Sequence, residues 1–407
     1  MQWHQVMNKI TRRQFLYCSA AIFSASAIPA WAARPSGAKP GNEYGKEDVS
    51  GRVFRGDAPE KPWKWSHEGL FYDKLKNDRV ICGVCPNRCN LAPGDRSVCR
   101  SKVNIGGTLY TLTYGNPCAV HLDPVEKKPL FHFKPRSKAF SIATTGCNLR
   151  CLNCQNWEIS QARPEDVRYS ELFPKEAVEA AKRVSAESIA YTYSEPVTFF
   201  EYMIDTARIA KEEGIYNLLI SNGYINREPL LELCRVVDGA NVNLKSFSDS
   251  IYRKLNGGRL QPVLETFRTM HEKGIHFEIT NLVVPGYADD QEMVKRMCEW
   301  IVENLGPDHP LHFLRFFPKY KLNRLPPTPL STLTRFRELA LSGGIRYVYL
   351  GNVPDNEGNN TYCHNCHKML VERKGYLIPE YNLTGNRCKF CNTVIPGVWD
   401  EGGPCPV

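Results

Sequence analysis

Residues 144–157 have the sequence Thr-Thr-Gly-Cys-Asn-Leu-Arg-Cys-Leu-Asn-Cys-Gln-Asn-Trp and directly follow the apolar run Ala139–Ala143. Three cysteines in this stretch, Cys147, Cys151 and Cys154, have the spacing C-x3-C-x2-C. Thiolates are the usual protein ligands of iron–sulfur clusters. Three of them on one short loop can bind three irons of a [4Fe–4S] cube and leave the fourth iron open for chemistry, as catalytic zinc sites keep an open position. A zinc site or an electron-transfer ferredoxin loop are the alternatives for these cysteines alone.

Apolar, β-rich runs alternate with amphipathic helical patterns from Lys138 onward. Such alternation predicts βαβ units and a parallel sheet, which closes into a full or partial (β/α) barrel with its chemistry at the carboxyl ends of the strands. The expected strands are Phe140–Thr144, Ser188–Tyr193, Asn217–Ser221, Asn241–Ser246, Phe277–Val284, Leu311–Phe317 and Tyr347–Leu350. The expected helices include Pro174–Ala186, Val197–Glu213, Leu260–Lys273, Gln291–Leu305 and Leu330–Leu341.

Polar residues at the strand ends are the candidate ligand-binding residues. Ser194 and Glu195 follow the second strand, and a carboxylate there is a suitable acceptor for the amino group of a bound amino acid. Asn222 follows the third strand, where it either binds a ligand or makes a turn. Lys245 interrupts an apolar strand and needs a partner, and the guanidinium of Arg315 is suited to hold a carboxylate.

A first cysteine cluster lies before the predicted barrel. Cys82, Cys85 and Cys89 are followed after nine residues by Cys99, and turn-forming residues lie between them. The segment is too short to bury a large core, so a bound metal is expected to stabilise it. Zinc and a second iron–sulfur cluster both remain open for this set.

A second cluster lies near the C-terminus. Cys363 and Cys366 form one C-x2-C knuckle, and Cys388 and Cys391 form another 21 residues further on. Paired knuckles indicate a four-thiolate metal site, most simply zinc in a ribbon-like or rubredoxin-like module.

The N-terminus has the features of an export signal. Arg12 and Arg13 are followed by Phe-Leu, a short apolar stretch and a small-x-small cleavage pattern after Ala32. The paired arginines predict a twin-arginine signal peptide over residues 1–32 and a periplasmic protein. The alternatives are an uncleaved segment that tethers the protein at the membrane, or a start codon placed too early in a cytoplasmic protein. Residues 33–65, rich in Gly, Pro and charge, are expected to form a flexible linker.

Composition narrows the function classes. The chain has 407 residues, 16 cysteines and a net charge of +9. Most cysteines are clustered, which favours metal sites over disulfides. There is no long basic run with interleaved aromatic residues, so no nucleic-acid partner is expected.

Several motifs together resemble the radical S-adenosylmethionine (SAM) enzymes, and within them the AmmeMemoRadiSam-system family, which is related to the pyruvate formate-lyase activating enzymes. The resemblance runs from about Gly69 to Trp399. It is carried by CGVCPNRC at 82–89, TTGCNLRCLNCQNWEIS at 144–160, AYTYSEP at 190–196, SNGY at 221–224, NLKSF at 243–247, NLVVPGYAD at 281–289, LHFLRFFPKYKL at 311–322, YVYLGNVP at 347–354 and the paired knuckles.

The resemblance implies a partial (β/α)6 barrel, TIM-like, with small cysteine-rich metal modules before and after it. The expected boundaries are an N-terminal four-cysteine module at 66–130, a radical SAM barrel at 131–355 and a zinc-ribbon-like module at 356–407. By position, the three loop cysteines would bind the [4Fe–4S] cluster, and Ser194-Glu195 would contact the methionine amino group of SAM. Asn153 occupies the position at which the family has an aromatic residue that contacts adenine, and Trp157 is the candidate to make this contact instead.

The implied activity is reductive cleavage of SAM to give a 5′-deoxyadenosyl radical that abstracts hydrogen from a protein or small-molecule substrate. The partners it implies are a low-potential electron donor of the flavodoxin or ferredoxin type, and a glycyl-radical enzyme or Memo-like and Amme-like proteins. Two other classes stay open: an iron–sulfur electron-transfer protein without SAM turnover, and a metal-stapled nucleic-acid-binding module.

Overall fold

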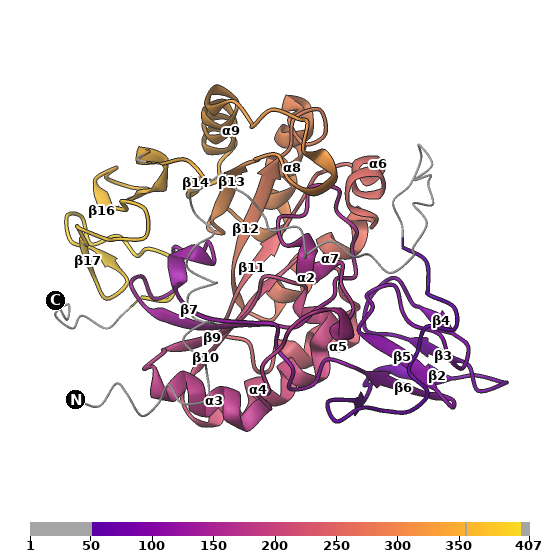
Figure 1. Ribbon diagram of the computed structural model, residues 1–407. Coiled ribbons are helices and arrows are strands. Elements are labelled where there is room, and N and C mark those ends of the chain that lie inside the picture. The colour runs from indigo at the N-terminus through magenta and orange to yellow at the C-terminus, as the bar shows by residue number, and fades with distance from the viewer. Residues whose placement is uncertain (1–50, 355, 400–407) are drawn as a thin grey trace, which may run out of the picture. The chain divides into compact units, whose positions relative to one another are not determined.

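The computed structural model describes residues 51–354 and 356–399 (Figure 1). The predicted signal peptide at 1–32, the first part of the predicted linker and Cys405 lie outside the described residues. In the described part of the chain, no helix is long and apolar enough to cross a membrane.

An eight-stranded sheet forms the centre of the fold. Its strands follow each other in space as they do in the chain: β7 (Ala119–Pro124), β8 (Lys138–Ala143), β9 (Ser188–Tyr191), β10 (Tyr216–Ser221), β11 (Gly239–Asn243), β12 (His276–Val283), β13 (Leu311–Arg315) and β14 (Val348–Gly351). The strands from β8 to β14 are parallel, whereas β7 is antiparallel to β8. The sheet is open between β7 and β14, which confirms the predicted partial barrel. Strand β7 lies before residue 131, so the sheet begins earlier than the expected boundary.

Amphipathic helices connect the parallel strands, because each must bury one apolar stripe against the sheet. They are α3 (Pro174–Arg183), α4 (Phe200–Glu212), α5 (Arg227–Leu233), α7 (Leu260–Glu272), α8 (Gln291–Leu305) and α9 (Leu330–Ser342). Val263, Phe267 and Met270 form the buried stripe of α7. Three shorter elements are α2 (Trp157–Ser160), α6 (Asp249–Ile251) and a π-helical turn at Tyr252–Asn256.

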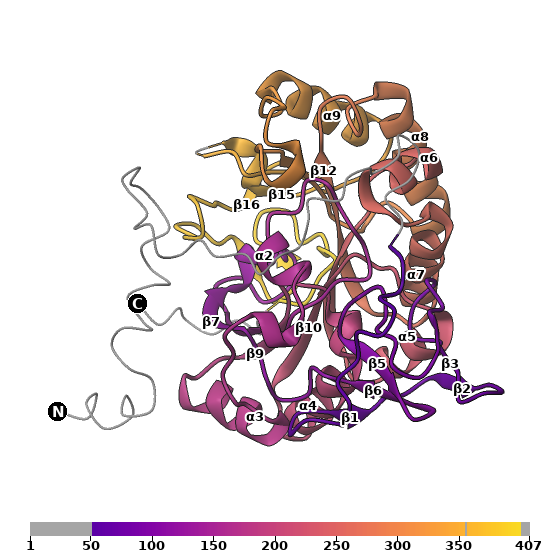
Figure 2. The same cartoon turned by 45° about the vertical axis from the view of Figure 1, so that its right-hand side comes forward.

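The N-terminal module consists of two small antiparallel sheets that pack against α4 and the start of α5 (Figure 2). Their strands are β1 (His67–Glu68), β2 (Tyr72–Lys74), β3 (Val80–Cys82), β4 (Asn90–Leu91), β5 (Lys102–Ile105) and β6 (Thr108–Thr111). A buried ion pair fixes this packing, because Lys102 Nζ lies 2.6 Å from a carboxylate oxygen of Glu201 in α4.

The end of the predicted linker belongs to this module rather than to a flexible segment. Phe54 and Arg96 exchange two backbone hydrogen bonds of 2.8 Å each, and Trp65 packs on Tyr169 with ring centroids 4.6 Å apart. The Gly, Pro and charged residues that suggested a linker are interspersed with aromatic residues, and burial of these aromatic residues is favourable.

The C-terminal module contains two hairpins, β15 (Thr361–Tyr362) with β16 (Met369–Val371) and β17 (Leu383–Thr384) with β18 (Arg387–Cys388). It packs against the end of the sheet near β14, where Leu370 and Ile395 share a cluster with Tyr349. His132 connects the two parts, since its Nε2 lies 2.6 Å from the Tyr349 hydroxyl and its Nδ1 lies 2.7 Å from the carbonyl of Pro396.

Candidate functional site

The cysteine loop begins where β8 ends and needs a glycine to turn. Gly146 has φ +103°, and a Cβ there would lie 2.3 Å from Ser101 Oγ and 2.5 Å from the carbonyl oxygen of Cys99. Only glycine tolerates both the positive φ and this close approach. The loop is therefore packed directly against the N-terminal module.

The three loop thiols are half-buried, and two of them receive hydrogen bonds from the surrounding loops. Asn256 Nδ2 donates to Cys151 Sγ at 3.2 Å, and Asn222 Nδ2 lies 3.7 Å from Cys147 Sγ. Burial raises the pKa of Cys147 well above its ordinary value and that of Cys154 to about 11. Protonated thiols are poor ligands, but a bound metal withdraws their protons. The donor set thus has the composition and the supporting hydrogen bonds of an iron–sulfur site.

Glu195 lies at the end of β9 with its carboxylate buried and fixed. Ser221 Oγ donates to its Oε1 at 2.7 Å, and the backbone N–H of Asn222 donates to its Oε2 at 2.9 Å. A third donor, the backbone N–H of Val197, contacts Oε1 at 3.2 Å. Burial raises the pKa of Glu195, and these hydrogen bonds oppose the rise. A buried carboxylate held in one orientation is suited to bind an ammonium group.

Several buried polar oxygens at this edge of the sheet have no hydrogen-bond partner in the described structure. They belong to Thr145, Asn153, Ser194, Asn256 and Asn281. Buried polar groups are normally hydrogen-bonded, so these unpartnered oxygens are available to a polar ligand bound at this edge of the sheet. The residues present therefore fit a cluster-bound SAM molecule.

Lys245 and Arg315, the two predicted cations, have different surroundings. Lys245 is half-buried just beyond β11, and its charge partly opposes the burial that raises the pKa values of Glu195 and Cys154. It is thus near both groups. Arg315 Nε donates to the carbonyl of Thr328 at 2.9 Å, and its guanidinium lies over the Phe317 ring at 5.2 Å. In the described residues, no hydrogen bond or ion pair joins Arg315 to Glu195 or to the loop cysteines.

Two asparagines in the site were not predicted. Asn148 accepts a hydrogen bond from Asn222 Nδ2 at 2.8 Å and so orients the amide beside Cys147. Asn256 ends the π-helical turn, which also accepts backbone hydrogen bonds from Arg150 and Leu152 in the cysteine loop. π-helical turns are frequent at functional sites, but the only trace in the sequence is the turn-forming Asn-Gly-Gly at 256–258.

Trp157, the predicted substitute for the adenine contact, stacks on Tyr320 with ring centroids 5.2 Å apart and an interplanar angle of 13°. Its side chain is partly exposed beside the cysteine loop. Contact with adenine at this position stays a prediction.

The four C-terminal cysteines are gathered for a single metal ion. Their Sγ atoms all lie within 4.8 Å of one another, with Cys363 and Cys391 3.6 Å apart and Cys366 and Cys388 3.7 Å apart. Tetrahedral zinc with Zn–S bonds of about 2.3 Å places its sulfurs roughly 3.8 Å apart. The geometry fits such an ion, and zinc itself stays a prediction.

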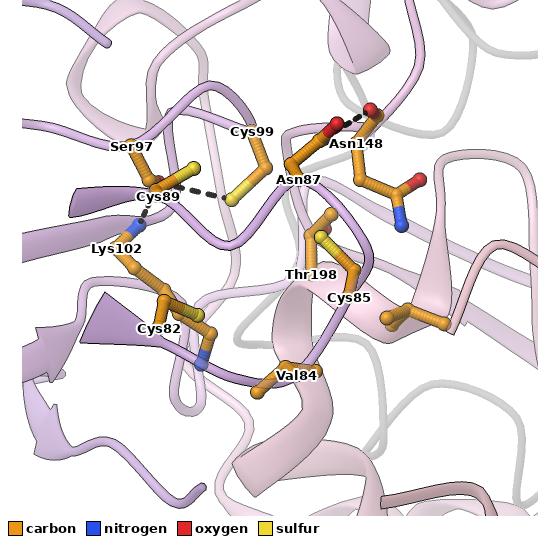
Figure 3. Close-up of a pocket in the computed structure, with 11 residues that line it drawn as sticks. Cys82, Val84, Cys85, Asn87, Cys89, Ser97, Cys99, Lys102, Asn148 and Thr198 are labelled. Atoms are coloured by element: carbon orange, nitrogen blue, oxygen red, sulfur yellow. Dashed lines mark hydrogen bonds between the residues drawn. The ribbon is translucent and has the colours of Figure 1, made fainter. Parts of the chain in front are cut away.

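The four N-terminal cysteines are all buried and line one cavity together with Lys102 and Asn148 (Figure 3). Asn87 Nδ2, from the loop between Cys85 and Cys89, donates to the carbonyl of Asn148 at 2.7 Å. The cysteine-rich module and the loop with Cys147 are thus in direct contact.

Three comparisons with known proteins found similar sequences and structures. Residues 141–301 match the Radical SAM superfamily. The pyruvate formate-lyase 1-activating enzyme of Escherichia coli is 28% identical over 221 residues, which cover 50% of this chain and 89% of that enzyme. A radical SAM methyltransferase from Sphaerobacter thermophilus superposes with a TM-score of 0.42 and 15% identity, over 54% of this chain and 67% of the other.

The fold, the three-cysteine loop and the match over residues 141–301 define a radical SAM domain in this chain. More narrowly, the chain belongs to the same family as an uncharacterized protein of Methanocaldococcus jannaschii. The two are 46% identical over 330 residues, 81% of this chain and 98% of that protein.

Proposed function

We propose that this protein is a radical SAM enzyme whose SAM molecule binds between the cysteine loop and Glu195. When bound, the [4Fe–4S] cluster supplies the electron that cleaves SAM to methionine and a 5′-deoxyadenosyl radical, which abstracts a hydrogen atom from the substrate. The main structural support for this proposed SAM site is the position of Asn222. Its backbone N–H donates to Glu195 while its side-chain amide lies beside Cys147 Sγ. A cluster ligand and an acceptor for an amino group are thereby held by one residue.

The candidate site residues take separate roles in this proposal. Cys147, Cys151 and Cys154 hold the cluster, and the amides of Asn222 and Asn256 donate to two of their sulfurs. Glu195 accepts the methionine ammonium group, with Ser194 beside it. Lys245, whose positive charge acts on Glu195, is the residue that contacts the methionine carboxylate in this proposal. Arg315 is the second predicted cation, fixed by Thr328.

The substrate class is proposed from likeness. The Escherichia coli relative is named for activating pyruvate formate-lyase 1, and its similarity covers half of this chain. This supports a glycyl-radical enzyme as the protein substrate and a flavodoxin or ferredoxin type protein as the electron donor. Memo-like and Amme-like partners are proposed from the motif resemblance alone, with a small molecule as the alternative substrate.

Export by the twin-arginine route is proposed from residues 1–32. This route carries folded proteins, which suits a chain whose metal sites are filled before transport. A reporter fused after residue 50 should reach the periplasm, and replacement of Arg12 and Arg13 by lysine should retain it in the cytoplasm. A reporter that stays in the cytoplasm with both arginines present contradicts export.

Electron paramagnetic resonance tests the proposed SAM site directly. The reduced, reconstituted protein should show a cluster signal that shifts when SAM is added, because SAM occupies the open iron. The same signal should be absent from the Cys147→Ala/Cys151→Ala/Cys154→Ala variant. A loop-cluster signal that SAM leaves unchanged would favour the simple electron carrier.

A further inference from the structure

The N-terminal cysteines form a metal site whose geometry differs from that of the C-terminal site. Cys82, Cys85, Cys89 and Cys99 line one cavity (Figure 3). In the described ranges, 51–354 and 356–399, only the C-terminal cysteines form a group of three or more thiols close enough together to hold one metal ion, with Sγ atoms all within 4.8 Å of one another. The N-terminal thiols line a common space but do not form such a group.

This spacing argues against a single ion. One zinc ion draws its four sulfurs to roughly 3.8 Å from each other, and the C-terminal set shows such contacts at 3.6 and 3.7 Å. A cube of four irons and four sulfides keeps its thiolates further apart, since each binds a different corner. Among the described residues, the loop cysteines Cys147, Cys151 and Cys154 likewise do not form a group that could hold one metal ion. The N-terminal set thus resembles the cluster site of the same chain and not its zinc-like site.

The surroundings of the cavity suit a buried cluster. Ser97 Oγ lies 3.1 Å from Cys99 Sγ, and hydrogen bonds to sulfur tune iron–sulfur clusters. The apolar side chains of Val84 and Val197 line the same cavity. Lys102 also lines it, buried and paired with Glu201, so a fixed positive charge faces thiolates that would otherwise be isolated.

The cavity borders the SAM-binding loop. Asn148, between Cys147 and Cys151, lines the cavity, and its backbone carbonyl accepts the hydrogen bond from Asn87. On the other side, the carbonyl of Cys99 lies against Gly146, one residue before Cys147. The N-terminal cysteine set therefore borders the loop that carries Cys147.

We propose that Cys82, Cys85, Cys89 and Cys99 bind a second [4Fe–4S] cluster, which passes single electrons to the cluster on the Cys147 loop. A low-potential donor of the flavodoxin or ferredoxin type reduces the second cluster by one electron. That cluster is then reoxidised as the loop cluster is reduced by one electron. The transfer step rests on the proposed function, whereas the presence of the second cluster does not.

The test uses the full chain with the first cluster removed. The Cys147→Ala/Cys151→Ala/Cys154→Ala variant is reconstituted without oxygen, and its iron, zinc and acid-labile sulfide are measured. We expect about four irons and four sulfides per chain, and a reduced signal that SAM does not shift. Acid-labile sulfide distinguishes a cluster from a single iron ion bound by the C-terminal cysteines, because a single iron ion carries no sulfide.

Two further variants in that background assign the ligands. Adding Cys85→Ser and Cys99→Ser should remove the sulfide while the C-terminal metal is retained, which shows that the chain still folds. Adding Cys118→Ser, a thiol outside the set that contacts the Ala143 carbonyl at 3.5 Å, should leave the sulfide unchanged. A triple-alanine variant with two zinc ions and no sulfide would overturn the second cluster. Wild-type protein that fails to cleave SAM, while the triple variant keeps its sulfide, would overturn only the proposed function.

Discussion

The backbone N–H of Asn222 donates to Glu195 Oε2 at 2.9 Å, although the two residues follow different strands, β10 and β9. Parallel strands end at the same edge, so residues that are 27 positions apart meet there. The side-chain amide of Asn222 then reaches Cys147 Sγ. Asn222 therefore contacts both Glu195, the anionic acceptor, and Cys147, a predicted cluster ligand.

Replacement of Glu195 by alanine should weaken SAM binding without loss of the cluster. A charge-assisted hydrogen bond contributes on the order of 1.5–3 kcal/mol, so the dissociation constant should rise roughly ten- to a hundredfold. Glu195→Gln keeps the shape without the charge and should lie between. Equilibrium dialysis measures the affinity, with Glu187→Ala, an exposed carboxylate at the start of the same strand, as the control. Equal affinity of Glu195→Ala and wild type would remove Glu195 from the site.

Asn256→Ala should make the loop cluster harder to reduce. The amide hydrogen bond to Cys151 Sγ stabilises the more negative, reduced cluster. A hydrogen bond of about 0.5–1.5 kcal/mol corresponds to roughly 20–60 mV for one electron. A redox titration followed by electron paramagnetic resonance should therefore show a lower midpoint potential. Asn304→Ala, whose amide contacts Trp300 and Arg268 on the helical layer, should leave it unchanged. An unshifted potential in Asn256→Ala would show that this contact does not tune the cluster.

Loss of a C-terminal cysteine should release one metal ion and loosen only the C-terminal module. The free energy of structural metal binding is folding free energy, so Cys363→Ser and Cys388→Ser should make residues 356–399 sensitive to protease while SAM binding persists. Elemental analysis and limited proteolysis measure both effects. Cys234→Ser, a half-buried thiol outside all three cysteine sets, is the matched control. If wild-type protein held no metal beyond the iron–sulfur sites, the assignment of this module would be wrong.

His132 should make stability depend on pH. Burial lowers its pKa to about 3 in the folded protein, against about 6.5 in the unfolded chain. Between these values the unfolded state binds a proton that the folded state does not, so stability falls as pH falls. At pH 5 the loss from this residue is about 2 kcal/mol relative to pH 8.

Urea unfolding of wild type and His132→Gln at pH 8 and pH 5 measures this effect. The variant should be less stable at pH 8 because it loses contacts to Tyr349 and Pro396, yet its stability should change less between the two pH values. His67→Gln, on the exposed strand β1, should keep the wild-type dependence. Parallel pH profiles for wild type and His132→Gln would mean that His132 is protonated in the folded state.

The positions of Cys147, Glu195 and Asn222 follow from sequence, because each comes directly after an apolar β-rich run and parallel strands bring such positions together. Asn256 could not be found this way, since a single π-helical turn has no periodic pattern. The surroundings of Arg315 depend on how residues after β13 fold back to Thr328, which spacing does not encode. The spacing of the N-terminal cysteines in the sequence allowed zinc or a cluster, and only the positions of their sulfurs in space favour the cluster.

Formation of 5′-deoxyadenosine tests the central claim most directly. Reconstituted protein given SAM and dithionite without oxygen should produce 5′-deoxyadenosine and methionine in equal amounts. Cys147→Ala, Cys151→Ala and Cys154→Ala should each abolish both products, while Cys298→Ala, in the core of α8, should not. If the triple-alanine variant still cleaved SAM, or if wild-type protein with a full loop cluster formed no 5′-deoxyadenosine, the account of this protein as a radical SAM enzyme would be contradicted.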